Sequence, residues 1–279
     1  MTRNKKNNKK EDQKKEKSIN KKKSSNTGGS KSKKKPAVKA TVKKKASSDT
    51  PKAINDSNIS LEGLLRAGCH FGHSVSKVNP RMQDYIFTAR EGIHIFDLVK
   101  TKNQLEKAIE YLFLLVSEGG KIIFLGTKRQ AIEATELAAK KTGMFYVTTR
   151  WVGGLLTNWK EVRKNLDRLD QLNKKLAKKN TSLTKYEISV LKREQRRLEN
   201  LYGGLMGLEN LPQALFVVDP KKEKTAVREA KRMGVTVVAI ADSNADPRGI
   251  DYLIPANDDA KASVEYILAK VAQKIDSHG

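Results

Sequence analysis

Short apolar runs that alternate with longer helical stretches are the feature that most constrains how this chain can fold. The runs lack the polar alternation of a one-sided strand, which indicates strands covered on both faces. Such strand–helix alternation predicts an α/β fold with a doubly wound parallel sheet and right-handed crossovers. The runs occupy residues 122–125, 144–147, 214–218, 235–241 and 252–254, and the helical stretches occupy residues 129–141, 222–232 and 258–275.

Capping signals predict where several other elements begin. Ser60 precedes Leu-Glu-Gly-Leu-Leu and is expected to cap a short helix, after which a Gly/His-rich turn follows. Thr101 and Gln104 have the spacing of a capping box, so a long helix is expected to open at Thr101. Asn257 is expected to cap the last helix, whose first turn would then hold two acids. Two short strands are expected ahead of the long helix, at residues 85–87 and 93–96.

An insertion interrupts the alternation between the second and third apolar runs. Residues 159–180, and the residues that follow Thr184, carry apolar side chains at spacings of three and four, and Thr184 with Glu187 forms a second capping box. Two such helices can pack antiparallel as a coiled-coil hairpin, and the segment is too polar for the core, so it should protrude. We therefore expect three regions, which are a tail at residues 1–58, a body at residues 59–158 and 203–279, and a hairpin at residues 159–202.

Positive charge gathers in two of these regions. The chain has 56 Lys and Arg against 31 Asp and Glu; the tail holds 20 against 5 and the hairpin holds 13 against 6. The tail lacks aromatic residues and cannot offset an ordering entropy of about 1–2 kcal/mol per residue, so we expect it to be disordered. Charged helices are ordinarily explained by a face that contacts solvent. Here the excess of Lys and Arg over Asp and Glu favours contact with nucleic-acid phosphates. The outward hairpin cations are Lys160, Arg163, Lys164, Arg168, Lys174, Lys175, Lys178, Lys179, Lys192, Arg193, Arg196 and Arg197.

The sequence also excludes several protein classes. Cys69 is the sole cysteine, so no disulfide can form within the chain, which fits a reducing compartment. No apolar run is long enough to span a bilayer, and the N-terminus has neither a secretory core nor the Arg-rich composition of a transit peptide. A cytoplasmic protein is the expectation.

An enzyme is the main alternative that this fold class invites, because doubly wound sheets bind ligands at the carboxyl ends of their strands. The first such turn reads Gly126-Thr127-Lys128-Arg129, which has the spacing of neither a dinucleotide-binding nor a Walker loop. Cys69 beside His70 suggests a nucleophile and base, yet adjacent residues rarely face each other and no third group is evident. We expect no catalytic residues and no cofactor.

Metal binding is a second alternative. His70 and His73 have a metal-like spacing, to which Asp242 and Asp246 could add oxygen ligands. The wider acidic group could hold Mg²⁺, although helix and turn capping explains it better. We expect no metal; the acids concerned are Asp242, Asp246, Asp251, Asp258 and Asp259.

Several strings resemble those of a known family. Ala-Gly-Cys-His-Phe-Gly-His at residues 67–73 and Asn-Pro-Arg-Met at 79–82 are similar to the opening of bacterial small-subunit ribosomal protein two. The resemblance continues, in order, from Ser60 almost to the C-terminus. Its other strings are Tyr-Ile-Phe at 85–87, Gly-Ile-His-Ile at 92–95, Gly-Thr-Lys at 126–128, the segment at 150–158 and the segment at 241–260.

This resemblance implies a flavodoxin-like body with a protruding coiled-coil hairpin. It implies a structural role in the small ribosomal subunit, with binding to small-subunit ribosomal RNA and neighbouring ribosomal proteins and support for attachment of ribosomal protein one. The hairpin favours the bacterial or organellar branch. Val78 departs from the aromatic residue that the family commonly has before Asn-Pro, and the basic tail has no family role to carry over.

The expected RNA contacts come from basic and polar residues of the body and the hairpin. Arginine and lysine would reach phosphates, whereas Trp151 either stacks on a base or packs in the core at a tight turn. A DNA-compacting protein would explain the tail but not the nearly neutral body. The expected contacts are Arg81, Lys128, Arg129, Arg150, Trp151, Asn158, Lys160, Arg163 and Lys164.

Overall fold

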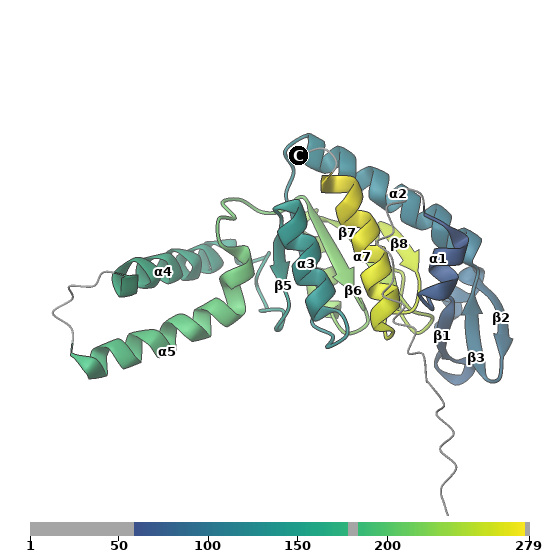
Figure 1. Ribbon diagram of the computed structural model, residues 1–279, viewed down its shortest axis with the longest axis horizontal. Helices are drawn as coiled ribbons and strands as arrows, with labels where there is room; N and C mark the ends of the chain where they lie inside the picture. Colours follow the sequence, from purple (N-terminus) through teal and green to yellow (C-terminus); the bar gives the residue numbers. More distant parts are fainter. Residues whose placement is uncertain (1–58, 178–183, 277–279) are drawn as a thin grey trace, which may run out of the picture. The chain divides into compact units, whose positions relative to one another are not determined.

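The computed structural model describes residues 59–177 and 184–276 (Figure 1). The tail and the turn expected at residues 181–183 lie outside these residues. A five-stranded parallel sheet has the order β5-β4-β6-β7-β8, which is 2-1-3-4-5 along the chain, the order of flavodoxin-like folds. The predicted α/β parallel sheet is therefore confirmed. Its strands are β4 (Ile122–Leu125), β5 (Phe145–Val147), β6 (Ala214–Val218), β7 (Thr236–Ala241) and β8 (Tyr252–Pro255).

Different helices cover the two faces of this sheet, and Figure 1 shows α3 (Ile132–Thr142) and α7 (Lys261–Asp276) over one of them. Phe124 and Phe216 belong to the cluster formed with α2 (Leu98–Ser117), α3 and α7. Leu215, the neighbour of Phe216 on β6, belongs to the opposite cluster with α6 (Lys224–Met233). All residues of β4 and β6 are buried, which explains why their sequences show no polar alternation.

A separate three-stranded antiparallel sheet precedes α2, with the order β1-β3-β2. Ser60 caps α1 as predicted, since its Oγ accepts a hydrogen bond from Gly63 N at 3.0 Å. Glu91 and Gly92 join two of the strands with φ values of 53° and 78°, a turn that matches strand twist. The Gly/His-rich segment begins with the expected turn, at residues 67–70, and continues as the strand Phe71–Ser74. The elements are α1 (Leu61–Arg66), β1 (Phe71–Ser74), the 3-10 turns η1 (Val75–Lys77) and η2 (Pro80–Tyr85), β2 (Ile86–Arg90) and β3 (Ile93–Phe96).

Two predicted helix starts are wrong, each for a tertiary reason. Asp97, and not Thr101, caps α2. Thr101 Oγ1 donates to Pro255 O at 2.7 Å and thereby ties α2 to the end of β8. Asn257 caps a turn ahead of α7, where its Oδ1 accepts from the backbone N of Asp259 and Ala260. The two acids therefore precede the first turn of α7.

The insertion folds into α4 (Trp159–Ala177) and α5 (Lys185–Tyr202), which lie alongside each other (Figure 1) and are followed by the 3-10 turn η3 (Gly203–Leu205). Their contacts run antiparallel: Asn173 Oδ1 accepts from Gln195 Nε2 at 2.6 Å. The capping box of Thr184 and Glu187 is confirmed. A buried apolar seam joins the two helices and continues into one face of the sheet. Its buried members in the two helices are Val162, Leu166, Leu169, Leu172, Leu198 and Tyr202.

Candidate nucleic-acid interface

The cations of α5 face solvent without acidic partners. Lys192, Arg193 and Arg196 are exposed and have no carboxylate within salt-bridge distance among the described residues. With Lys185 they line a shallow hollow along the helix. Two of the three acids of α5 are used elsewhere, because Glu187 accepts hydrogen bonds at the helix cap and Glu194 binds α4, whereas Glu199 is exposed. The helix therefore presents unneutralised positive charge.

The cations of α4 differ from those of α5, because most of the α4 cations form ion pairs with a carboxylate. Lys164 Nζ lies 2.6 Å from Glu161 Oε1, and Arg168 donates to both carboxylate oxygens of Glu194 at 3.0 and 3.1 Å. Arg163 lies 3.7 Å from Asp167 and also donates to the carbonyl of Glu209. Lys174 likewise pairs with Asp170. Lys160 is exposed and has no such partner among the described residues.

The loop that enters α4 is held by one buried carboxylate. Glu229 of α6 accepts hydrogen bonds from Trp151 Nε1 at 3.2 Å, Gly154 N at 2.8 Å and Leu156 N at 3.1 Å. Burial alone would raise the pKa of Glu229, but these donors hold the pKa below its ordinary value. Gly154 has a φ of 88°, a conformation that glycine adopts without strain. Trp151 is therefore a half-buried, hydrogen-bonded part of the loop, which fits the packing role, while its stacking on a base stays a prediction.

Arg150 and Asn158 mark the two ends of this loop and are both exposed. Arg150 lines a hollow together with Arg197 of α5, at the base of the helix pair. The backbone carbonyl of Asn158 accepts from Glu161 N at 3.1 Å and so begins α4. The structure thus brings Arg150 to the α5 cations, although more than forty residues separate Arg150 from Arg197 in the sequence.

Lys128 has acidic partners instead of an open surface. Its Nζ lies 2.6 Å from Asp258, 2.7 Å from Asp259 and 3.0 Å from Asp219. Burial opposes the charged ammonium, but the carboxylates raise the pKa of Lys128 above its ordinary value. Burial and the neighbouring Asp219 raise the pKa of Asp258 to about 7. The ammonium of Lys128 already faces carboxylates within the fold, and the expected phosphate contact at Lys128 stays a prediction.

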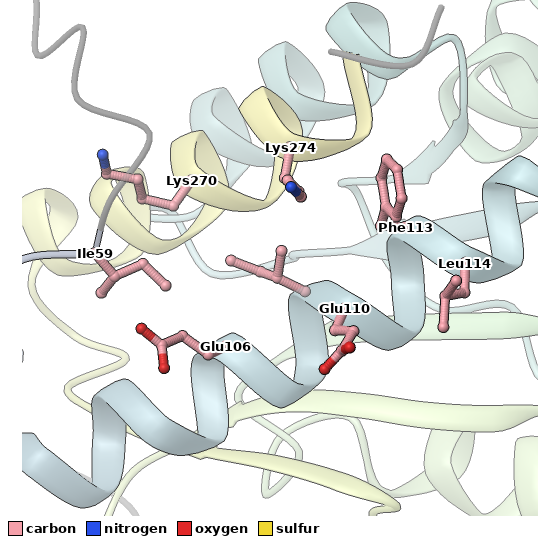
Figure 2. Close-up of a pocket in the computed structure, with 8 residues that line it drawn as sticks. Ile59, Glu106, Glu110, Phe113, Leu114, Lys270 and Lys274 are labelled. Carbon is pink, nitrogen blue, oxygen red and sulfur yellow. The ribbon is translucent and has the colours of Figure 1, made fainter.

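The remaining expected contacts lie on the body. Arg129 is exposed and has no acidic partner among the described residues, whereas Arg81 is exposed and lies 3.7 Å from Asp246. A hollow between α2 and α7 has a mixed lining, with Glu106 and Glu110 on α2 and Lys270 on α7 (Figure 2). Because acids and lysines share this hollow, it does not suit a polyanion.

The possible metal ligands differ from those expected. His73, Asp242 and Asp259 offer ligand atoms within 4.8 Å of one another, whereas His70 and Asp246 are not in this group. His73 Nδ1 lies 2.9 Å from Asp242 Oδ2, so the histidine already has a carboxylate partner. The other acids have different roles. Asp246 caps a turn, since it accepts from Arg248 N at 3.1 Å, as the sequence favoured. Asp251 accepts from Val237 N of β7 at 2.8 Å, and Asp258 faces Lys128.

Cys69 does not resemble a nucleophile. It is fully buried, and burial raises its pKa to about 11, so the thiol stays protonated at neutral pH. Its Sγ lies 3.2 Å from Ser263 Oγ. Burial also lowers the pKa of the neighbouring His70.

Sequence reasoning missed two features of this interface. It noted the α5 cations only as part of a charged surface. The signal that separates them from the α4 cations is the spacing of acids three or four residues from the cations within α4, together with one ion pair from Arg168 to Glu194 of α5. It missed Glu229 altogether, because the donors lie more than seventy residues away in the chain.

Two further observations bear on identity. No helix within residues 59–177 and 184–276 combines the length and hydropathy needed to cross a bilayer. A family model described as ribosomal protein S2 matches residues 64–277, which is most of the chain and includes both sheets and the helix pair. The chain therefore belongs to the ribosomal protein S2 family, whose members are structural, non-enzymatic proteins of the small ribosomal subunit that act in translation.

Proposed function

We propose that this protein binds small-subunit ribosomal RNA chiefly through the exposed cations of α5 and the adjoining base of the helix pair. The observation that carries this proposal is the row of Lys192, Arg193 and Arg196, which have no acidic partner among the described residues. Unpaired cations release counterions from RNA when they bind phosphates, whereas cations in ion pairs must first give up a partner. Arg150 and Arg197 extend this surface at the loop.

The other expected contacts take graded roles in this proposal. Asn158, Lys160 and Arg129 are exposed and remain in the contact set, and so does Arg81. Arg163 and Lys164 have a smaller share, because carboxylates already face them. Lys128 and Trp151 hold the body together instead. The Lys-rich residues 1–58 add affinity through their charge.

The family further suggests a place for the protein among its neighbours. We propose contacts with other small-subunit ribosomal proteins and support for the attachment of ribosomal protein one, in cytoplasmic ribosomes. The division into tail, body at residues 59–158 and 203–279, and coiled-coil hairpin at residues 159–202 is part of the same proposal.

Removal of three α5 cations tests the RNA interface. The variant Lys192→Gln, Arg193→Gln, Arg196→Gln keeps helix propensity and should lower the salt dependence of binding to small-subunit ribosomal RNA by about 2–3 in log–log slope. The control variant changes three exposed body lysines that have no acidic partner among the described residues, namely Lys77→Gln, Lys107→Gln and Lys121→Gln.

The readouts are filter binding from 50 to 300 mM salt and incorporation into small subunits, with circular dichroism to check helix content. The control should lower the slope by less than 1, because those lysines lie outside the interface. Equal slopes for the α5 variant and wild type, at native helicity, would contradict the proposal.

A further inference from the structure

A second basic surface lies on α6, remote in sequence from the helix pair. Lys221, Lys224, Arg228 and Lys231 line a shallow groove whose rim carries Arg248 and Asp246. The four lining cations, here called the α6 basic face, are all exposed. None has a carboxylate within salt-bridge distance among the described residues, whereas Arg248 pairs with Asp246 at 2.6 Å.

The α6 basic face has no acids of its own segment beside it because this segment buries its acidic side chains and exposes its basic ones. Glu223 and Glu229, the acids of this segment, are both buried. Thr127 Oγ1 donates to Glu223 at 2.5 Å, and Glu229 accepts from the loop that enters α4. These carboxylates are committed to donors inside the protein, so they do not neutralise the outward cations. Residues 221–232 hold six Lys and Arg against two Glu, and because both acids are buried the solvent side of the segment is strongly positive.

The spacing of the cations suits a phosphate backbone. Lys224, Arg228 and Lys231 follow one another at intervals of four and three residues, which places them along one side of the helix. Seven residues at a rise of about 1.5 Å span about 10 Å. A nucleic-acid strand carries about one phosphate per 3.4 Å of axis, so roughly three phosphates occupy the same length.

We propose that the α6 basic face is a second RNA-binding surface, which contacts the phosphate backbone of a different RNA segment from the one bound by α5. This inference rests on the proposed RNA-binding function and extends it from the helix pair to the body. Side chains of this kind fix the orientation of a protein on RNA without reading its sequence. With two separate contacts, the RNA would hold the body as well as the helix pair.

The test uses the full chain and the variant Lys224→Gln, Arg228→Gln, Lys231→Gln, compared with the body control Lys77→Gln, Lys107→Gln, Lys121→Gln. Both variants lose the same charge. With small-subunit ribosomal RNA as the probe, the α6 variant should lower the log–log salt slope by about 2–3, and the control by less than 1. Hydroxyl-radical footprinting should show protection lost at RNA positions that the α5 variant still protects.

Several results would overturn the proposal. One is an α6 variant that binds ribosomal RNA and protects it in footprinting as wild type does. Another is an equal loss of salt slope for the α6 variant and the control, which would reflect net charge alone.

Anionic phosphatidylserine vesicles and inorganic phosphate serve as further probes. Loss of vesicle binding with unchanged RNA binding would assign the face to a membrane surface, and competition by millimolar phosphate would assign it to a free anion. If wild type bound no ribosomal RNA, the proposed function itself would fail; a normal α6 variant beside a defective α5 variant would reject only this inference.

Discussion

The carboxyl end of the sheet and the outer side of α5 both carry basic side chains, but the surroundings of these side chains differ. At the sheet, Lys128 is enclosed by three carboxylates, and Glu229 accepts the donors of a loop. On α5, Lys192, Arg193 and Arg196 have no acidic partner among the described residues. The difference teaches that one fold neutralises some of its basic side chains and leaves others without an acidic partner among the described residues.

The largest expected effect is at Lys128. Replacement by Met would leave the buried Asp258 and its neighbours without a counter-charge, which should lower the free energy of unfolding by about 3–5 kcal/mol. Urea unfolding followed by circular dichroism measures this loss. Arg129→Gln is the matched control, because this exposed neighbour should change stability by no more than about 0.5 kcal/mol. Similar free energies of unfolding for the two variants would contradict the claim that Lys128 stabilises the fold more than an unpaired cation does.

A smaller loss is expected at Glu229. Glu229→Gln puts an amide where two carboxylate oxygens now accept several N–H groups, so about 2 kcal/mol of stability should be lost. Trp151 fluorescence should change as well, since its indole N–H loses an acceptor. Glu118→Gln, on an exposed helix end, serves as the control. An unchanged unfolding midpoint for Glu229→Gln would mean that the loop does not depend on this carboxylate.

The same residue should also contribute to the acid sensitivity of the protein. The pKa of Glu229 is lowered in the folded state, so its stabilisation is complete above the unfolded value of about 4.3 and is lost as pH falls through the folded pKa. The difference in unfolding free energy between wild type and Glu229→Gln should therefore shrink below about pH 4. Urea titrations at pH 3, 4, 5 and 7 test this sign, and a difference that grew on acidification would contradict it.

The smallest effect on stability is expected on α5. The variant Lys192→Gln, Arg193→Gln, Arg196→Gln should unfold within about 0.5 kcal/mol of wild type per substitution, because these side chains pair with nothing that is lost. The same variant is the one expected to lose RNA affinity. A large loss of stability here would mean that the α5 cations serve the fold, as Lys128 does.

Local patterns predicted the elements that local forces determine. The central strands at residues 122–125 and 214–218 match the structure because continuous apolar runs suit strands buried on both sides. The helix pair and its capping box at Thr184 were equally visible, since contacts three and four residues apart define them.

Features that depend on distant partners could not be predicted. Thr101 looks like a helix cap, but its hydroxyl bonds Pro255, 154 residues away. Lys128 looks like a phosphate contact, but its partner Asp258 lies 130 residues along the chain. The α6 basic face depends on the fold in a similar way, because the sequence alone does not show that Glu223 and Glu229 are both buried.

The bond between Glu229 and the loop ahead of α4 also has a consequence for the order of events during synthesis. A ribosome making this chain finishes both helices of the insertion before it reaches residue 229, since α5 ends at Tyr202. The helices can coil early from local contacts, yet the carboxylate that fixes their point of attachment is added only later. The insertion is therefore built first as a loosely tethered unit, and α6 sets its base when the second half of the sheet arrives.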